Sequence, residues 1–298
     1  MKIQKLILRP FAWGFGLVAI ATVLSGTRGG AETLYGLGGN NTLLSFDSAN
    51  PALVTTRPIL GAAPLVGIDF RPANGVLYGV SSSRFLYTIN LTSGLASPVS
   101  GTPFSASAAG TSFGFDFNPT VDRIRIVNDA AENFRANPDT GTALVDGILA
   151  YAVGDTAFGL DPMIVGAAYA NNFAGSSLSP LLVLDARLDT LARQDPANSG
   201  VLTTIGFLGV NFTGAGGFDV SGLSGTAYAA LTPAAGGGSQ LYQINVASGA
   251  ATSLGAIGFS GNLVGLAAPV PEPSTWAMLV AGIGCFLGMT RWRRSPKK

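Results

Sequence analysis

The 298-residue chain contains no histidine, and its only cysteine is Cys285. Without histidine, a Ser-His-Asp triad and histidine-ligated zinc centres are excluded. A single cysteine cannot form a disulfide within the chain. Charged residues are also scarce, at 11% of the sequence, whereas 47% of the residues are hydrophobic and 41 are glycine. A chain this apolar is expected to fold around a packed core, and its glycines lack the triplet period of collagen.

The few charges are distributed unevenly along the chain. Much of the positive charge lies at the two ends, before residue 31 and after residue 290. Residues 32–219 carry 8 arginines against 15 acidic residues, so the body of the protein is acidic. An acidic body argues against nucleic acid as a partner, because the phosphate backbone is bound through surplus positive charge.

The first 31 residues are typical of an export signal. Lys2, Lys5 and Arg9 precede an apolar run over residues 11–24, and small residues end at Ala31. This order predicts a signal peptide, residues 1–31, which the export machinery recognises and which is cleaved after Ala31. The alternative is an uncleaved anchor helix, which the short apolar run disfavours.

A Gly-x-Asp motif recurs along the middle of the chain. Its copies are Gly67-Ile68-Asp69, Gly114-Phe115-Asp116, Gly159-Leu160-Asp161 and Gly217-Phe218-Asp219, with a degenerate copy at Gly265-Leu266-Ala267. A recurrence of 45 to 58 residues marks an array of supersecondary units such as propeller blades.

Each motif is followed by turns and further short runs rich in β-branched and aromatic residues. After the first motif these runs are residues 76–80, 85–90 and 95–100, which completes a four-stranded antiparallel unit. In the fourth unit we expect Gly159-Leu160-Asp161 in the innermost strand, residues 167–170 in the second and 181–185 in the third. We therefore predict an all-β fold over residues 32–269, a five-bladed propeller-like ring of four-stranded antiparallel blades. A β-sandwich built from similar hairpins is the rival arrangement.

The order of the strands also predicts how the ring closes. The first unit lacks an innermost strand and the last unit has only that strand, so one blade must be completed from both ends of the chain. We expect residues 263–266 to pair antiparallel with residues 34–37, which removes two exposed strand edges.

One part of the repeat resembles a known family. The residues that carry the resemblance are Asp116-Phe117-Asn118-Pro119, Asp122-Arg123-Ile124-Arg125-Ile126-Val127 and Asn133-Phe134-Arg135-Ala136-Asn137-Pro138-Asp139-Thr140-Gly141. They resemble the signature of an uncharacterised family of secreted bacterial proteins, a domain of unknown function. The resemblance implies a secreted β-repeat domain and brings no established activity.

The C-terminal stretch, residues 270–298, carries a second resemblance. Pro271, Glu272 and Pro273 precede an apolar run over residues 276–289, and basic residues follow. This stretch looks like a PEP-CTERM sorting signal, which implies processing by an exosortase in Gram-negative bacteria that make exopolysaccharide. The apolar run predicts a short transmembrane helix that holds the protein in the inner membrane before processing, with the basic end in the cytoplasm. A plain tail anchor is the alternative, and it leaves the Pro-Glu-Pro element unexplained.

The repeated aspartates are the first candidate site. If Asp69, Asp116, Asp161 and Asp219 converge on the central channel, they form a ring of carboxylates, and hard oxygen ligands of this kind suit Ca²⁺. The alternative, which we favour, is that each carboxylate accepts hydrogen bonds from backbone amides of its own hairpin or of a neighbouring blade. On that reading no cofactor is required.

Three arginines form the second candidate site. Alternation places Arg123 and Arg125 on one face of a strand, and the following hairpin brings Arg135 alongside them. Together they can bind a carboxylate or sulfate of an acidic polysaccharide. The alternative is that nearby acidic residues, among them Asp122 and Glu132, neutralise these arginines within the protein.

These observations leave three classes of function. The leading one is a non-catalytic protein of the cell envelope or extracellular matrix that an exosortase sorts and that contacts exopolysaccharide. The second is a calcium-dependent propeller hydrolase resembling lactonases, because a metal-bound water can act without histidine. The third is a binding module for an acidic glycan. In each case we expect the protein to be exported, to the periplasm, the outer surface or the extracellular matrix.

Overall fold

The structure is a computed structural model that describes residues 30–104 and 109–271. Most of the predicted signal peptide, Glu272, Pro273 and the predicted transmembrane segment lie outside the described residues. Within the described ranges, no helix is long and apolar enough to cross a membrane. The only helix there is a single 3₁₀ turn, η1 (Ala197–Ser199).

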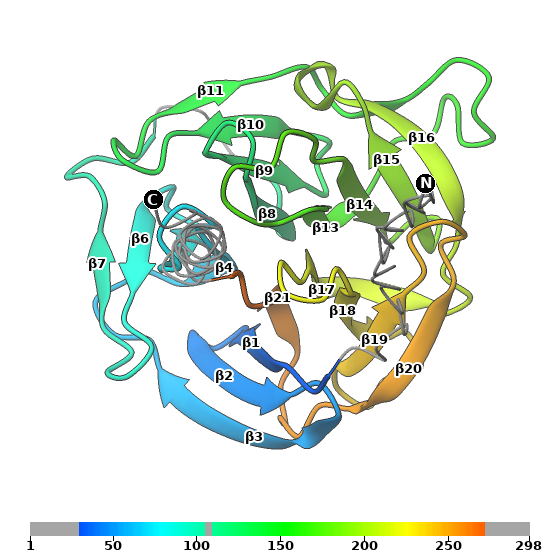
Figure 1. Cartoon of the computed structure of the whole chain (residues 1–298). Helices are drawn as coiled ribbons and strands as arrows, with labels where there is room; N and C mark the ends of the chain where they lie inside the picture. The colour runs from blue at the N-terminus through cyan, green and yellow to red at the C-terminus, as the bar shows by residue number, and fades with distance from the viewer. Residues whose placement is uncertain (1–29, 105–108, 272–298) are drawn as a thin grey trace, which may run out of the picture.

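Five antiparallel sheets stand around one axis as the blades of a propeller (Figure 1). From the axis outward, blade 1 consists of β21 (Leu263–Ala267), β1 (Thr33–Gly38), β2 (Thr42–Asp47) and β3 (Asn50–Pro58). Blade 2 consists of β4 (Leu65–Phe70), β5 (Leu77–Ser81), β6 (Leu86–Ile89) and β7 (Ala96–Pro98). Blade 3 consists of β8 (Phe113–Asn118), β9 (Arg123–Asn128), β10 (Asn133–Ala136) and β11 (Ala143–Val145).

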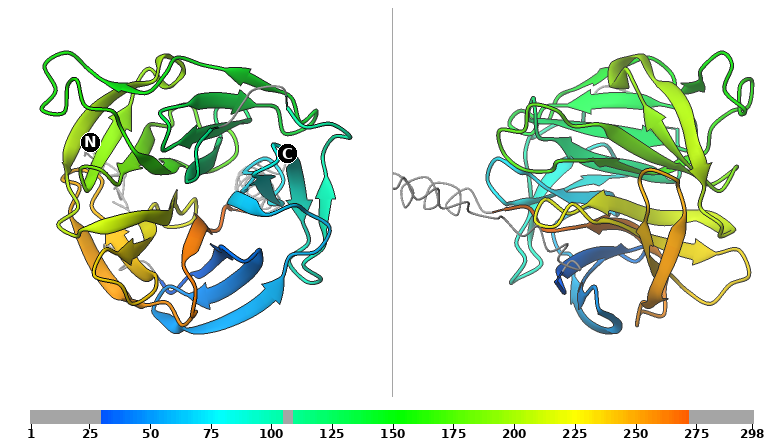
Figure 2. Two further views of the ribbon diagram at one scale, coloured as in Figure 1. Left: turned by 180° about the vertical axis from the view of Figure 1, so that it is seen from behind. Right: turned by 45° about the vertical axis from the view of Figure 1, so that its right-hand side comes forward.

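The remaining two blades complete the ring. Blade 4 consists of β13 (Ile164–Tyr169), β14 (Leu181–Asp185), β15 (Thr190–Gln194) and β16 (Val201–Phe207), with β12 (Ala150–Tyr151) added parallel to β16. Blade 5 consists of β17 (Phe212–Val220), β18 (Ala227–Pro233), β19 (Gln240–Ile244) and β20 (Ala251–Ala256). The predicted five-bladed propeller of antiparallel blades is thus confirmed, and Figure 2 shows the same ring from behind and obliquely.

Three blades use the same turn between their third and fourth strands. In each turn an asparagine side chain accepts the backbone N–H two residues later, at 2.9 Å for Asn90, Asn137 and Asn245. A glycine with positive φ follows four residues after the asparagine, at Gly94, Gly141 and Gly249. The side-chain acceptor and the left-handed glycine together reverse the chain without strain, which explains the Asn-x-x-x-Gly spacing of the repeat.

The ring closes through the predicted pairing of the first and last strands. β21 pairs antiparallel with β1, with Leu266 opposite Gly36 and Gly265 opposite Leu37. Blade 1 is therefore built from both ends of the body, and the prediction for residues 263–266 is confirmed. Closure leaves no innermost strand without a neighbour on either side.

The prediction for the fourth blade was wrong by one strand. Gly159 and Asp161 lie in the loop before β13, where Gly159 has φ 82° and Asp161 is exposed. Residues 167–169, expected in the second strand, lie in the innermost strand β13, and β14 is the second strand rather than the third. The loop copy of the motif cannot extend into a strand because Pro162 has no N–H for a ladder.

The hydrophobic core is divided into five clusters, each between two neighbouring blades. The cluster between blades 4 and 5, for example, packs Leu184 of β14 against Phe218 of β17. The cluster between blades 1 and 5 packs Leu44 of β2 against Leu241 of β19. Because each blade buries one face in each of two clusters, its inner strands are buried on both sides, as in β8 and β13, whereas outermost strands such as β3 and β20 are largely exposed.

Glycine in the repeated motif allows the innermost strands to approach each other closely. A Cβ on Gly217 would lie 2.3 Å from the Leu266 backbone nitrogen of the next blade, and one on Gly114 would lie 2.6 Å from the Ala167 nitrogen. The same crowding occurs at Gly67 and Gly166, against the Cβ atoms of the following blade. The first position of the motif is therefore glycine because no side chain fits there.

Candidate functional sites

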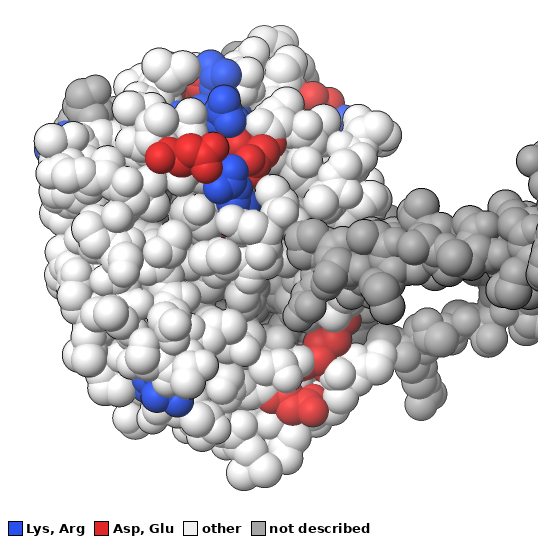
Figure 3. Space-filling view, turned by 60° about the vertical axis from the view of Figure 1, so that its left-hand side comes forward, with Lys and Arg blue, Asp and Glu red and all other residues white. Residues whose placement is uncertain are grey.

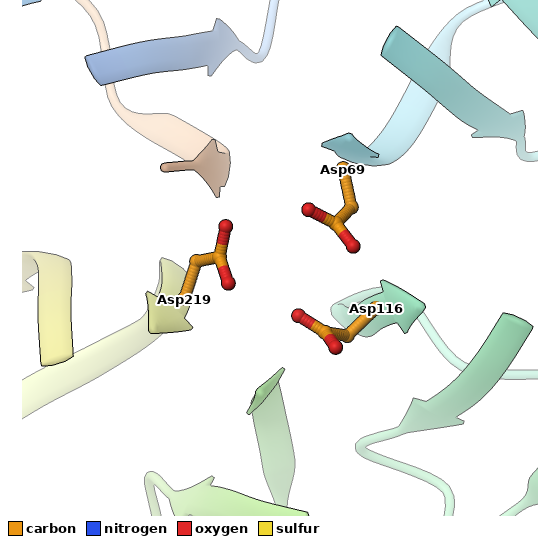
Figure 4. Close-up of side chains that lie close together, drawn as sticks. All are labelled: Asp69, Asp116 and Asp219. Carbon is orange, nitrogen blue, oxygen red and sulfur yellow. The ribbon is translucent and has the colours of Figure 1, made fainter. Parts of the chain in front are cut away.

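Three of the repeated aspartates meet on the propeller axis. Asp69 projects from β4, Asp116 from β8 and Asp219 from β17, and one carboxylate oxygen of each lies within 4.8 Å of the others (Figure 4). All three are buried, with exposed fractions of 0 to 1%. The corresponding positions of the other two innermost strands are alanine, Ala168 in β13 and Ala267 in β21. Asp161, the fourth residue predicted for this ring, lies outside it on the exposed loop.

Each axial aspartate connects its blade to the next one. Asp69 Oδ2 accepts the Phe117 N–H at 2.8 Å, and Asp116 Oδ1 accepts the Tyr169 N–H at 3.0 Å. Asp219 Oδ2 accepts the Ala268 N–H at 2.6 Å. In all three cases the donor is the residue after the aspartate position of the neighbouring innermost strand. The aspartates therefore stabilise the junctions between blades 2 and 3, 3 and 4, and 5 and 1.

Two of the carboxylates also accept an amide of their own strand. The Phe70 N–H donates to Asp69 Oδ1 at 2.6 Å within β4. The Val220 N–H donates to Asp219 Oδ1, also at 2.6 Å, within β17. Five backbone donors thus occupy five of the six carboxylate oxygens. The sixth, Asp116 Oδ2, is buried and has no hydrogen-bond partner among the described residues.

Burial is the main cause of the raised pKa of each of the three axial aspartates. Burial raises the pKa of Asp69 and of Asp116 well above the ordinary value of 3.8, and the charges of the neighbouring aspartates raise both further. Burial also raises the pKa of Asp219, to about 6, although the amide bonds from Ala268 and Val220 oppose the shift. Within the described residues no arginine bonds to these carboxylates. Their negative charge is therefore unfavourable in this site, and protonation relieves it.

The axial triad has the donor atoms that a hard cation requires. Three carboxylate oxygens are the ligand type of Ca²⁺, but Ca²⁺ takes six to eight oxygens, and five of the six here already accept amides. On the side of the motif glycines, the space on the axis amounts to about 10 Å³, lined by Gly67, Phe115, Gly217 and their counterparts. This space admits about one water molecule, so it offers no path for a substrate to a bound ion.

The three predicted arginines line one pocket. The pocket has a volume of about 440 Å³ and lies between blades 3 and 4, at the ends of β8 and β13. Its wall contains Arg123 and Arg125 of β9, Arg135 of β10, and Asn198 of η1. Arg125 is directly opposite Arg135 in the strand register, as alternation predicted. We call this pocket the arginine pocket.

Asp146 pairs with two of these arginines, and sequence reasoning missed it. Asp146 Oδ2 lies 2.7 Å from Arg125 Nη1 and 2.7 Å from Arg135 Nε. Asn133 and Asn198 each accept a further hydrogen bond from the Arg125 guanidinium, at 2.6 Å. Asp146 follows β11 and shares no motif with the arginines, so no signal in the sequence connects them.

The acidic residues expected to neutralise the arginines bind elsewhere. Asp122 forms a bidentate ion pair with Arg71 of blade 2, which also bonds to Asp139 at 2.7 Å. Glu132 accepts hydrogen bonds from Asn128 and from the Ala109 backbone. Figure 3 shows basic and acidic side chains gathered in one cluster on a surface that is otherwise mostly uncharged. The bond to Arg71 lowers the pKa of Asp139, and the charge of Arg123 contributes to that shift.

Comparison with known families agrees with this architecture. Residues 42–267 match the family described as Domain of unknown function (DUF4394). The chain belongs to this family. Residues 269–295 match the PEP-CTERM protein-sorting motif, so the DUF4394 domain is followed at once by an export and sorting signal for the cell envelope. Both resemblances found in the sequence are thereby confirmed.

The solved structures that match this chain are distant from it in sequence. A chain of the nidogen/laminin complex is 13% identical, with 82% of this chain and 100% of that chain covered and a TM-score of 0.49. An auxiliary nutrient binding protein from Bacteroides thetaiotaomicron VPI-5482 is 14% identical, with 67% and 56% covered and a TM-score of 0.42. No curated protein matches the chain. These similarities carry no functional argument for the DUF4394 domain.

Proposed function

We propose that this DUF4394 protein is a non-catalytic component of the cell envelope or extracellular matrix, which an exosortase processes and which contacts exopolysaccharide. The observation that carries the proposal is the position of the sorting motif. The match begins at residue 269, directly after the strand β21 that closes the ring. Removal of the tail therefore leaves every strand of the propeller in place, which suits a body that is released or transferred as an intact module.

The chemistry of the two candidate sites supports a non-catalytic role. The chain has no histidine, and the buried axial carboxylates are occupied by backbone amides. The arginine pocket holds cationic and amide groups, and no carboxylate is part of its wall. Such a wall suits recognition of an anionic group better than acid-base chemistry.

Sorting is tested with a tagged full chain in a host that carries the exosortase. We expect Glu272→Ala, and deletion of the exosortase gene, to leave the C-terminal segment attached and to retain the protein in the inner-membrane fraction. Asp161→Ala is the matched control, because it removes an exposed carboxylate of the body and should sort normally. Normal processing of Glu272→Ala, or normal processing of the wild-type chain in the strain without the exosortase, would contradict the proposal.

A calcium-dependent hydrolase is a second candidate, favoured only by the geometry of the axial triad. The three oxygens within 4.8 Å could hold one Ca²⁺. Calorimetric titration of the full chain with Ca²⁺ distinguishes the two proposals. Binding that Asp116→Asn abolishes, together with hydrolysis of a lactone, would support the enzyme, whereas an absence of heat supports the non-catalytic role.

A further inference from the structure

The wall of the arginine pocket exposes guanidinium groups with unused donors. Arg123 is exposed, and the only hydrogen bond of its side chain among the described residues goes from Nη1 to the Asp122 carbonyl at 2.8 Å. The Arg135 side chain is 37% exposed and uses only Nε, so both of its terminal nitrogens are without a partner in the described structure. Arg125 Nε is buried without a partner. The free donors of Arg123 and Arg135 are available to an acceptor that enters the pocket.

The charges around the pocket do not cancel. Three arginines lie in the pocket wall, Arg123, Arg125 and Arg135, and Arg71 of blade 2 lies beside them; three carboxylates, Asp122, Asp139 and Asp146, pair with members of this group. Two of these carboxylates bond to Arg71 outside the pocket wall, and Asp146 alone serves both Arg125 and Arg135. An anion of one negative charge would therefore complete the balance.

The rest of the wall is suited to a sugar ring. Val121, Ile124 and Pro196 supply apolar surface, and Asn118 and Asn198 supply side-chain amides. The volume of about 440 Å³ falls within the range of small-ligand sites. A planar carboxylate matches the fork of an arginine better than a spherical anion does, because two parallel N–H groups can donate to its two oxygens.

We propose that the arginine pocket binds a uronate residue of an acidic polysaccharide, with Arg123 and Arg135 donating to the sugar carboxylate. This inference rests on the proposed function, since delivery to the envelope is what brings the pocket to such a polymer. Arg125 is a positioning residue, held by Asp146, Asn133 and Asn198 beneath the wall.

The test is calorimetric titration of the full chain, kept in a mild detergent, with trigalacturonate and with its methyl ester. The methyl ester is the matched ligand, because it keeps the sugar rings and removes the negative charges. We expect trigalacturonate to bind, the ester to bind at least about tenfold more weakly, and added NaCl to weaken the interaction.

Variants locate the binding. Arg123→Gln and Arg135→Gln should each weaken trigalacturonate binding about tenfold without changing the melting temperature by more than a few degrees. Arg187→Gln is the control, because it removes the same charge from an exposed turn of blade 4 outside the pocket. If Arg135→Gln lowered the melting temperature strongly, the affinity of Arg123→Gln would still test the inference, because Arg123 forms no ion pair within the described residues.

Three outcomes would overturn the inference. They are no binding of trigalacturonate, equal affinity for the methyl ester, or a loss of affinity in Arg187→Gln as large as that in Arg123→Gln. A preference for a sulfated trisaccharide, or for anionic lipid vesicles, over trigalacturonate would also overturn it. Exosortase-dependent sorting with no uronate binding would remove this inference alone. Uronate binding by a chain that is not sorted would remove only the proposed function.

Discussion

At the scale of single residues, each position of the Gly-x-Asp motif has its own physical reason. The glycine leaves room for the next innermost strand, and the aspartate accepts a backbone donor of that strand. Three aspartates span three of the five junctions, and Asp69 and Asp219 each accept a second amide from their own strand. Asp116 accepts only one, from Tyr169. The three carboxylates are therefore not equivalent, and substitutions should distinguish them.

Asp116→Asn is expected to raise stability at pH 7, whereas Asp69→Asn is expected to lower it. The asparagine oxygen at residue 116 can keep the Tyr169 bond, and its NH₂ group would take the place of Oδ2, which has no partner. At residue 69 the NH₂ group would face one of two backbone donors and leave it unpaired, which costs about 1 to 3 kcal/mol. Urea denaturation of both variants measures the difference. A loss of stability in Asp116→Asn equal to that in Asp69→Asn would contradict this assignment.

The pH dependence of stability follows from the same groups. The pKa of Asp219 rises from 3.8 to about 6 on folding, so between these values the folded state binds more protons than the unfolded state. The stability that this group contributes is complete below about pH 4 and is lost as the pH rises through 6. Asp139 and Asp155 have lowered pKa values, so the stability that they contribute increases with pH and opposes the effect of Asp219. The effect of the triad is therefore measured as the difference in stability between the wild-type protein and a triad variant.

We therefore expect Asp116→Asn to gain stability relative to wild type as the pH rises from 4 to 7. The neutral asparagine removes one of the negative charges that face Asp69 and Asp219, and this relief grows as those groups ionise. Urea denaturation at each pH unit gives the difference directly. A difference that stays constant over this range would show that no proton is bound at the triad in the folded state.

At the scale of elements, the innermost strands determine the geometry of the ring. They touch each other at the motif glycines, where an added Cβ would meet the backbone of the neighbouring blade. The rest of each blade is joined to its neighbour by an apolar cluster, which adapts more easily to a change of one methyl group. An added methyl group should therefore destabilise the propeller more at the backbone contacts near the axis than in the side-chain clusters farther out.

Gly217→Ala should destabilise the propeller by about 2 kcal/mol or more, because blades 5 and 1 would have to separate to admit the Cβ. The added Cβ would lie 2.3 Å from the Leu266 nitrogen, which is a backbone atom and cannot move alone. Gly101→Ala is the control, since that Cβ would meet nothing within 4 Å. Thermal unfolding of the two variants tests the prediction, and equal melting temperatures would refute close approach as the reason for the glycine.

At the scale of the whole molecule, the ring depends on a strand that lies at the far end of the sequence. β21 supplies the innermost strand of blade 1 and contacts β17 and β4, its neighbours on both sides. Ala268, the residue after it, donates to Asp219. The sorting motif begins at residue 269, the next residue after this bond.

A chain of residues 32–268 should therefore fold cooperatively, whereas a chain that ends at residue 261 should lose most of its stability. The shorter chain lacks β21, which leaves two strand edges and the apolar clusters on either side of blade 1 exposed. Circular dichroism with urea denaturation compares the two. Cooperative unfolding of the shorter chain with an unchanged midpoint would show that closure contributes little.

Local pattern was enough to predict the number of blades, the closing strand and the pairing of Arg125 with Arg135. Each depends on period, alternation and turn residues, which act over a few neighbouring positions. The fourth blade was misread because its innermost strand has Gly166 followed by two alanines, while a loop before it happens to carry Gly159 and Asp161. The loop keeps the glycine and the aspartate of the motif, whereas the true innermost strand keeps only the glycine, so the pattern selected the loop.

Only the tertiary structure decided which carboxylate meets which donor. Asp146 pairs with both Arg125 and Arg135, and Asp122 pairs with Arg71 of another blade. Both contacts join segments that no sequence period relates. Likewise, the sequence predicted a ring of aspartates, but the count of five amides against six oxygens emerges only when five strands surround one axis. The sequence determines the local strands and turns, and the long-range burial of charge then selects the partners.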